Sequence, residues 1–400
     1  MQEFNPKEFV NNQVTEIRKV VNNEKALIAV SGGVDSTTCA VLAHRALGEN
    51  LLCVTIDDAF MRTGEPERIA QILSQPPLNL PTKILNVQKH FLNALEGLRD
   101  AEEKRKAFRE TFYKSLSETA KKESFRFLVQ GTIRADIDET TKGIKTQHNV
   151  LSQMGISPAE RYGFQLIEPL VSIYKPQVRE VARHLGVPSE LSERQPFPGP
   201  GLSVRVVGQN RTDKLESLKK ATAITEENLA KHRPNQYFAA IIDNEEKPHH
   251  PRLTRIREIV AQHLEVQSRH VFVRVFHDRA TGIKGGVRHY GEIVAVKVQT
   301  TNGHLHQPPI RDLADLQTKI IRANPSFTRV LYAVQETSQK QPYVVTIRAV
   351  QTRDFLTAEV SEIPWTTLIQ TAQNVLKVCS NVSCVYYDVT PKPPATIEME

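Results

Sequence analysis

The sequence has 400 residues, of which 40% are hydrophobic and 24% charged, a composition typical of a globular protein with two or three domains. It contains no apolar run long enough for a membrane span and no secretory signal pattern, so we expect neither. The net charge of +7 suits phosphate-rich small substrates as well as nucleic acid. Because no zinc-finger spacing, aromatic RNA-binding motif or long basic tract accompanies this charge, nucleic acid is not the expected partner.

The cysteines indicate a reducing environment. Cys39, Cys53, Cys379 and Cys384 form no CxxC pair and lie in apolar runs. Buried reduced thiols are therefore expected rather than a metal site or disulfides. A cytoplasmic location fits this pattern.

Strands and helices alternate in the first half of the chain. An amphipathic helix is expected within residues 1–24. Short apolar runs typical of buried parallel strands follow at 25–30, 51–56, 82–87 and 125–130. Helices are expected between them, at about 35–47, 65–74 and 88–122. This alternation predicts a parallel sheet with helices on both faces, in which ligands bind beyond the carboxyl ends of the strands.

The stretch QPFPGPGL at 195–202 interrupts this pattern, because its prolines and glycines cannot continue a helix or a central strand. One helix is expected at 212–232. Two similar segments follow, each with the order strand, helix, turn and strand, which we interpret as an internal duplication. Two unrelated units of the same order are the alternative. The predicted domains are 1–205, a helical connection at 206–266, and 267–400 with repeats at about 285–335 and 340–400.

The motif SGGVDSTT at 31–38 directly follows the first expected strand and opens a helix. It lacks the Gly-Lys-Ser/Thr ending of a Walker loop. Gly32 and Gly33 allow a tight turn that exposes backbone N–H groups, Ser31 and Ser36 add hydroxyl groups, and the N-terminus of the helix attracts anions. Asp35 would repel a phosphate unless a cation intervenes, which suggests Mg²⁺. A plain turn with an N-cap serine or aspartate is the alternative.

The motif SGGVDS after a buried strand resembles the pyrophosphate-binding loop of the ATP-pyrophosphatase superfamily. Other segments resemble the synthetase part of GMP synthase in order and approximate spacing: IDDAFMR at 56–62, FLVQGTIRADIDET at 127–140, GIKTQHNV at 143–150, LIEPL at 166–170, RQPFPGPGLSVRV at 194–206, VVTIRAVQTRDFLTA at 344–358 and YYDVTPKPPATIEME at 386–400. The sequence is therefore identified as a member of the GMP synthase family, without the glutaminase domain that usually precedes this part.

This resemblance implies an α/β fold in two parts. A parallel-sheet ATP-pyrophosphatase domain, similar to the adenine nucleotide alpha hydrolases, is expected at 1–205. The α+β C-terminal domain at 267–400 is expected to correspond to the part that dimerises and binds substrate in the family.

The resemblance also implies the chemistry. In the family, the C2 oxygen of XMP attacks the α-phosphorus of ATP, pyrophosphate leaves, and ammonia displaces AMP to give GMP. ATP is the expected co-substrate, with Mg²⁺. Free ammonium or a separate glutaminase subunit would supply the ammonia. Because both nucleophiles come from the substrates, catalysis would rest on positioning and charge stabilisation.

Matching positions assign roles by resemblance. The expected catalytic residues are Asp35, Lys145 and Lys175, and the expected metal ligands are Asp35 and Asp136. Asp136 and Glu139 match paired acids of the family, with helix capping as the alternative role. The expected ATP-binding residues are Ser31, Gly32, Gly33, Val34, Asp35, Ser36, Gly131 and Thr132. The expected substrate-binding residues are Arg288, Lys392, Thr396, Ile397 and Glu398.

Some positions depart from the family pattern, and they put the acceptor nucleotide in question. Residues unusual for the family are Gln147, Pro176, Gln177, Lys284, Gly286, Gln195 and Met399. Three readings therefore stay open: amidation of XMP or a related nucleotide, a non-catalytic nucleotide-binding protein on the same scaffold, and, more weakly, a tRNA-modifying enzyme. If the first repeat takes the place of a partner chain, the protein is a monomer rather than a homodimer.

Overall fold

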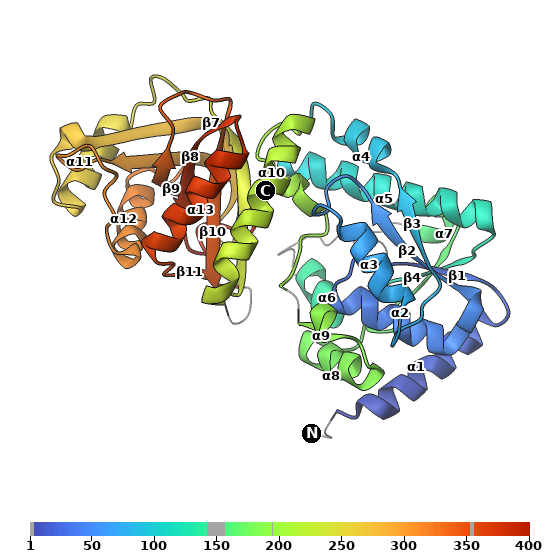
Figure 1. Cartoon of the computed structure of the whole chain (residues 1–400). Coiled ribbons are helices and arrows are strands. Elements are labelled where there is room, and N and C mark those ends of the chain that lie inside the picture. Colours follow the sequence, from blue (N-terminus) through green and yellow to red (C-terminus); the bar gives the residue numbers. More distant parts are fainter. Residues whose placement is uncertain (1–3, 142–156, 194, 353–355) are drawn as a thin grey trace. The chain divides into compact units, whose positions relative to one another are not determined.

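The computed structural model describes residues 4–141, 157–193, 195–352 and 356–400, and it divides the chain into two compact units (Figure 1). Unit 1 comprises Met1–Ala94 and Arg105–Gly199, and unit 2 comprises Leu95–Lys104 and Pro200–Glu400. Among the described residues, no helix is long and apolar enough to cross a membrane. All four cysteines are buried and free, as the sequence predicted.

Unit 1 contains a five-stranded parallel sheet in the order β3-β2-β1-β4-β5. This confirms the predicted parallel sheet. Four strands lie where apolar runs predicted them, whereas β5 was not predicted. The strands are β1 (Ala26–Ala29), β2 (Leu51–Asp57), β3 (Thr82–Asn86), β4 (Phe127–Val129) and β5 (Gln165–Ile167).

Helices cover both sides of this sheet (Figure 1). One group packs into a common hydrophobic core with the strands, and it comprises α1 (Pro6–Val21), α2 (Val34–Leu47), α3 (Glu65–Ser74) and α8 (Lys175–Leu185). On the other side, α4 (Gln88–Leu95) packs against α5 (Ala101–Glu123), with the rings of Phe91 and Phe108 4.6 Å apart. The short helices are α6 (Arg134–Thr141), α7 (Pro158–Tyr162) and α9 (Ser189–Ser192).

The helix predicted at 88–122 is interrupted. Gly97 adopts φ +75°, a left-handed conformation that ends the preceding helix readily. The Asp100 carboxylate then accepts hydrogen bonds from the backbone N–H groups of Glu102 (2.9 Å) and Glu103 (3.1 Å), which begins α5.

Unit 2 contains a seven-stranded mixed sheet. Six strands follow the order β11-β10-β12-β9-β8-β7, and β6 pairs with the free edge of β10. The strands are β6 (Gln236–Asp243), β7 (Val271–Lys284), β8 (Val287–Val298), β9 (Phe327–Glu336), β10 (Tyr343–Gln351), β11 (Glu359–Val360) and β12 (Val382–Asp388). The helices are α10 (Thr212–Leu229), α11 (Leu253–His263), α12 (Ile310–Ala323) and α13 (Trp365–Val378). The connection predicted at 206–266 is thus not purely helical, because it contains β6, whose apolar run YFAAII was overlooked.

The sheet of unit 2 is built from two similar halves. The segments β8–α12–β9 and β10–α13–β12 each form a parallel strand pair, and both pairs shift register once near their start. Both helices have 14 residues and begin after a proline, Pro309 or Pro364. The central strands β9 and β12 are antiparallel, and Tyr332 lies opposite Tyr387. The two segments therefore share their order, pairing and helix length, and the internal duplication stays a prediction.

The halves are nested in sequence. Each half has an outer antiparallel strand, which is β7 next to β8 and β6 next to β10. The paired strands β6 and β10 both belong to the second half, but β6 comes before the first half in the sequence and β10 comes after it. The first half is therefore inserted into the second, in the connection between β6 and β10. The repeats therefore begin earlier than the boundaries at 285 and 340 that the sequence suggested.

Candidate functional site

The SGGVDS loop follows β1 and ends at the N-terminus of α2. Gly32 adopts φ +75°, and Gly33 is the N-cap of the helix. The hydroxyl groups of Ser31 and Ser36 lie 3.2 Å apart, and the Ser36 hydroxyl donates to the Gly33 carbonyl at 3.2 Å. The loop thus turns tightly around a helix end that carries a partial positive charge, an arrangement suited to a phosphate group.

The end of β4 supports this loop. A Cβ atom on Gly131 would lie 3.0 Å from both the Asp35 carbonyl carbon and the Ser36 nitrogen, so a larger residue would press against the backbone of the loop. The next residue, Thr132, is buried, and its hydroxyl donates to the Glu168 carboxylate at 2.6 Å. Gly131 therefore lies beside the loop, and Thr132 follows it in the chain.

Asp35 occupies the first turn of α2 and faces the first residue of α8. Its Oδ2 lies 2.5 Å from the Lys175 ammonium. Burial raises the pKa of Asp35, and the Lys175 ammonium opposes this shift. The other oxygen, Oδ1, is buried and has no hydrogen-bond partner among the described residues. A carboxylate oxygen in this situation fits a divalent cation, so Asp35 fits the predicted Mg²⁺ ligand.

Asp136 contributes less clearly to a metal site. Its Oδ2 accepts a hydrogen bond from the Ile133 backbone N–H at 3.0 Å, which supports the capping alternative. Its negative charge nevertheless helps to raise the pKa of Asp35. Within the described ranges, no group of three metal-binding side chains is assembled. Mg²⁺ commonly takes one or two carboxylates and completes its shell with substrate phosphates and water.

Two further acidic residues at the carboxyl edge of the sheet were not singled out from the sequence. Burial raises the pKa of Glu168, which lies after β5 in the LIEPL segment. Burial raises the pKa of Asp58, after β2, to about 7, although its carboxylate accepts from the Phe60 backbone at 2.7 Å. Only their position directly after predicted strands could have indicated them.

Three residues of this region lie outside the described part of the structure. Lys145 and the unusual Gln147 fall within residues 142–156, and of Glu139 the side chain is not described.

The substitutions in α8 have a visible role. The Gln177 side chain accepts from the Tyr174 backbone N–H at 3.0 Å and Pro176 lies in the first turn, so together they favour a helix start that places Lys175 next to Asp35.

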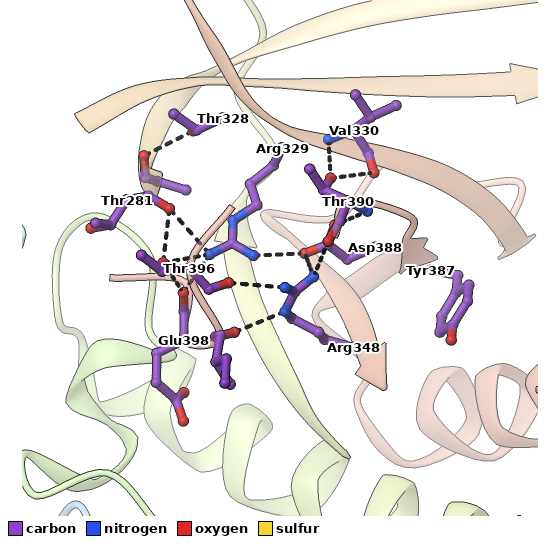
Figure 2. Close-up of polar contacts among 12 residues, drawn as sticks. Thr281, Thr328, Arg329, Val330, Arg348, Tyr387, Asp388, Thr390, Thr396 and Glu398 are labelled. Carbon is purple, nitrogen blue, oxygen red and sulfur yellow. Dashed lines mark hydrogen bonds and ion pairs between the residues drawn. The ribbon is translucent and has the colours of Figure 1, made fainter. Parts of the chain in front are cut away.

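In unit 2, a buried ionic cluster lies under the predicted nucleotide-binding tail (Figure 2). Arg329 from β9 and Arg348 from β10 both contact Oδ2 of Asp388, at 3.1 and 2.8 Å, and all three side chains are fully buried. Burial and the neighbouring Arg348 lower the pKa of Arg329 to about 9. The sequence did not predict this cluster, although an arginine within an apolar strand was a possible signal.

These arginines shape the tail. Arg348 donates to the carbonyl groups of Ile397 (2.8 Å) and Thr396 (2.9 Å), and Arg329 donates to the Thr396 hydroxyl (2.9 Å) and to the Glu398 carbonyl (Figure 2). The Glu398 carboxylate forms a bidentate pair with the buried Arg205, at 2.8 and 2.9 Å. The side chains of Thr396 and Glu398 therefore hold the tail in place, a role that the motif alone did not indicate.

The hairpin formed by β7 and β8 lies against the same tail. The Ile283 N–H donates to the Pro394 carbonyl at 2.6 Å, and the Thr281 N–H donates to the Met399 carbonyl at 2.8 Å. Met399, which replaces a tryptophan of the family, is fully buried in the hydrophobic core. Arg288 lies on β8 near the hairpin tip. A hairpin from the first half and a tail from the second half thus meet within one chain.

Gly282→Ala is expected to weaken nucleotide binding. The added Cβ would lie 2.6 Å from the Thr328 methyl group and 2.7 Å from the Pro394 carbonyl, so the tail must shift. We expect the KM for the nucleotide to rise about tenfold or more, while the KM for ATP, measured in the same steady-state assays, serves as the internal control. An unchanged nucleotide KM would show that the tail does not depend on this contact.

Known proteins are similar to this chain over nearly its whole length. Residues 6–188 match the family described as PP-loop domain, and residues 333–399 match the GMP synthase C terminal domain. The B subunit of glutamine-hydrolyzing GMP synthase from Sulfurisphaera tokodaii is 39% identical over 399 residues, covering 99% of this chain and 100% of that protein. The protein of the same name from Saccharolobus solfataricus is 43% identical over 397 residues, with equal coverage.

The chain belongs to the family of GMP synthase B subunits.

This membership confirms the predictions of an ATP-dependent ligase of GMP synthesis, with a PP-loop domain followed by a C-terminal α/β domain. It also confirms ATP with Mg²⁺ as the requirement of this family, in agreement with the environment of the Asp35 carboxylate. The tRNA-modifying alternative is excluded by the match over the full length.

Proposed function

We propose that the chain catalyses the amidation of XMP to GMP through an adenylated C2 oxygen, with release of AMP and pyrophosphate. One observation carries the proposal: the Asp35 carboxylate lies 2.5 Å from Lys175 at the N-terminus of α2, and its other oxygen is buried without a partner among the described residues. A cation ligand, an ammonium group and a glycine-rich helix start together match the needs of a leaving pyrophosphate.

Each group in unit 1 then has a task. The backbone N–H groups of Gly32–Ser36 and the hydroxyl of Ser31 hold the β- and γ-phosphates. Asp35 would hold Mg²⁺, and the ion would supply positive charge next to the phosphates. Lys175 supplies a second positive charge at the same place, and Gly131 and Thr132 keep the loop in position from the adjoining strand.

Unit 2 holds the acceptor nucleotide in this proposal. Arg288 and Lys392 are the cations that bind its phosphate, because a guanidinium and an ammonium both suit a monoester. The backbone of Thr396–Glu398, shaped by Arg329 and Arg348, borders the nucleotide. Amidation of another purine-like nucleotide remains the second candidate, and the loss of the family's acidic residue at Gly286 is the observation that favours it.

The products test the proposal. Purified protein with ATP, XMP and ammonium chloride is expected to release one AMP and one pyrophosphate for each GMP, measured by chromatography and a coupled pyrophosphate assay. Glutamine should replace ammonium only when a separate glutaminase subunit is added, as the name of the relatives suggests. Formation of ADP and phosphate would refute the proposal, and so would pyrophosphate release without amidation of any purine nucleotide.

All four cysteines are free thiols, and this supports a cytoplasmic location.

We infer that the protein acts as a monomer. The hairpin that carries Arg288 contacts the tail of the same chain, so the first half of unit 2 can take the place of a second protomer. Light scattering at micromolar concentration is expected to give a mass near 45.1 kDa. Mixing an Arg288→Ala chain with a Lys392→Ala chain should restore no activity, because rescue requires a site shared between chains.

A further inference from the structure

The segment Leu95–Lys104 is held firmly within unit 2, although most neighbouring residues in sequence belong to unit 1. The Lys104 side chain is fully buried, and its ammonium lies 2.5 Å from the Glu400 carboxylate and 2.7 Å from the Val206 carbonyl. At the other end, the Arg99 carbonyl accepts a hydrogen bond from the Tyr290 hydroxyl at 3.1 Å. Contacts within unit 2 therefore hold this segment on both sides of Glu102.

Glu102 lies between the two anchors and points its carboxylate at Arg288. The Glu102 Oε1 and Arg288 Nη1 atoms are 2.5 Å apart. The side chain of Glu102 is 57% exposed, whereas that of Arg288 is 26% exposed. The arginine that is proposed to bind the nucleotide phosphate thus already has an anionic partner from its own chain, and that partner lies at the surface.

We propose that Glu102 sets the affinity and selectivity of the nucleotide site by occupying Arg288 until a phosphate displaces it. The inference rests on the proposed function, because it takes Arg288 as a phosphate ligand. The carboxylate competes with the ligand for the same guanidinium. Glu102 is two residues from the buried Lys104, so its carboxylate stays close to Arg288 and can always compete with the ligand.

The difference in charge explains why a phosphate displaces the Glu102 carboxylate from Arg288. An exposed ion pair with a single carboxylate contributes little, because water and salt screen it. A phosphate monoester carries nearly two negative charges and three acceptor oxygens, and it binds a guanidinium through two hydrogen bonds. A nucleoside or a free base has no such group and cannot displace Glu102. The contact therefore favours nucleotides over their unphosphorylated precursors.

Glu102→Gln in the full chain tests this role, and Glu103→Gln is the matched control. Glu103 is an exposed neighbour on the same helix turn and its replacement removes the same charge. We expect the KM for XMP to fall about two- to fivefold in Glu102→Gln, the factor that an exposed ion pair contributes. Inorganic phosphate should become a stronger competitor of XMP in this variant. The KM for ATP should not change, and Glu103→Gln should match the wild type.

The opposite results would overturn the inference. An unchanged or higher KM for XMP in Glu102→Gln would show that the carboxylate is not a competitor, while GMP formation by the wild type would leave the proposed function intact. An equal fall in both variants would indicate a general effect of charge. If the wild type forms no GMP, the proposed function fails, and calorimetry of XMP binding to the wild type and Glu102→Gln still decides the role of Glu102.

Discussion

Replacing Asp35 with asparagine is expected to lower the rate of GMP formation at least about 100-fold, equivalent to roughly 3 kcal/mol of transition-state stabilisation. Asparagine keeps the shape of the side chain but removes its charge. The variant therefore loses the cation ligand, and Lys175 loses its partner at 2.5 Å. Initial rates of pyrophosphate release, measured at several Mg²⁺ concentrations, will show whether the effect acts through the metal.

The control for this variant is Glu190→Gln. Glu190 lies in unit 1 and forms an exposed ion pair with Arg68 at 3.1 Å; its side chain is 48% exposed, compared with 27% for Asp35. We expect its rate within about twofold of the wild type, since exposed pairs contribute little. An Asp35→Asn enzyme with nearly normal activity and normal Mg²⁺ dependence would mean that the SGGVDS loop has only a structural role.

Asp388→Asn is expected to destabilise unit 2 by about 3–5 kcal/mol, the usual cost of removing one member of a buried ionic cluster. The carboxylate of Asp388 lies between the guanidinium groups of Arg329 and Arg348, and all three side chains are excluded from water. Without it, two positive charges remain buried side by side. Urea denaturation monitored by circular dichroism measures the change in the free energy of unfolding.

Asp312→Asn provides the comparison on the same unit. Asp312 lies on α12, its side chain is 45% exposed, and its carboxylate is 3.7 Å from Arg311. Its replacement is expected to change the free energy of unfolding by no more than about 0.5 kcal/mol. Similar losses in both variants would show that burial of the Asp388 cluster has no special energetic role.

The sequence was sufficient to predict features that depend on neighbouring residues. The strands β1 to β4 appear as short apolar runs, and the SGGVDS loop combines its glycines and Asp35 within six positions. The order strand, helix and strand was also visible twice in unit 2, and the structure has a helix after a strand at both places. In each case the pattern lies within a short stretch of sequence, where the spacing of residues alone determines which side chains share one face of a helix or strand.

The tertiary structure decided what depends on distant residues. Arg329, Arg348 and Asp388 come from three strands, and nothing in their local sequences shows that one carboxylate serves two arginines. The pairing of Glu102 with Arg288 joins residues 186 positions apart. The nested order of the two halves likewise follows from strand pairing, since β6 meets β10 across the whole inserted half. Contacts of this kind depend on which residues packing brings together, and that becomes known only once the chain is folded.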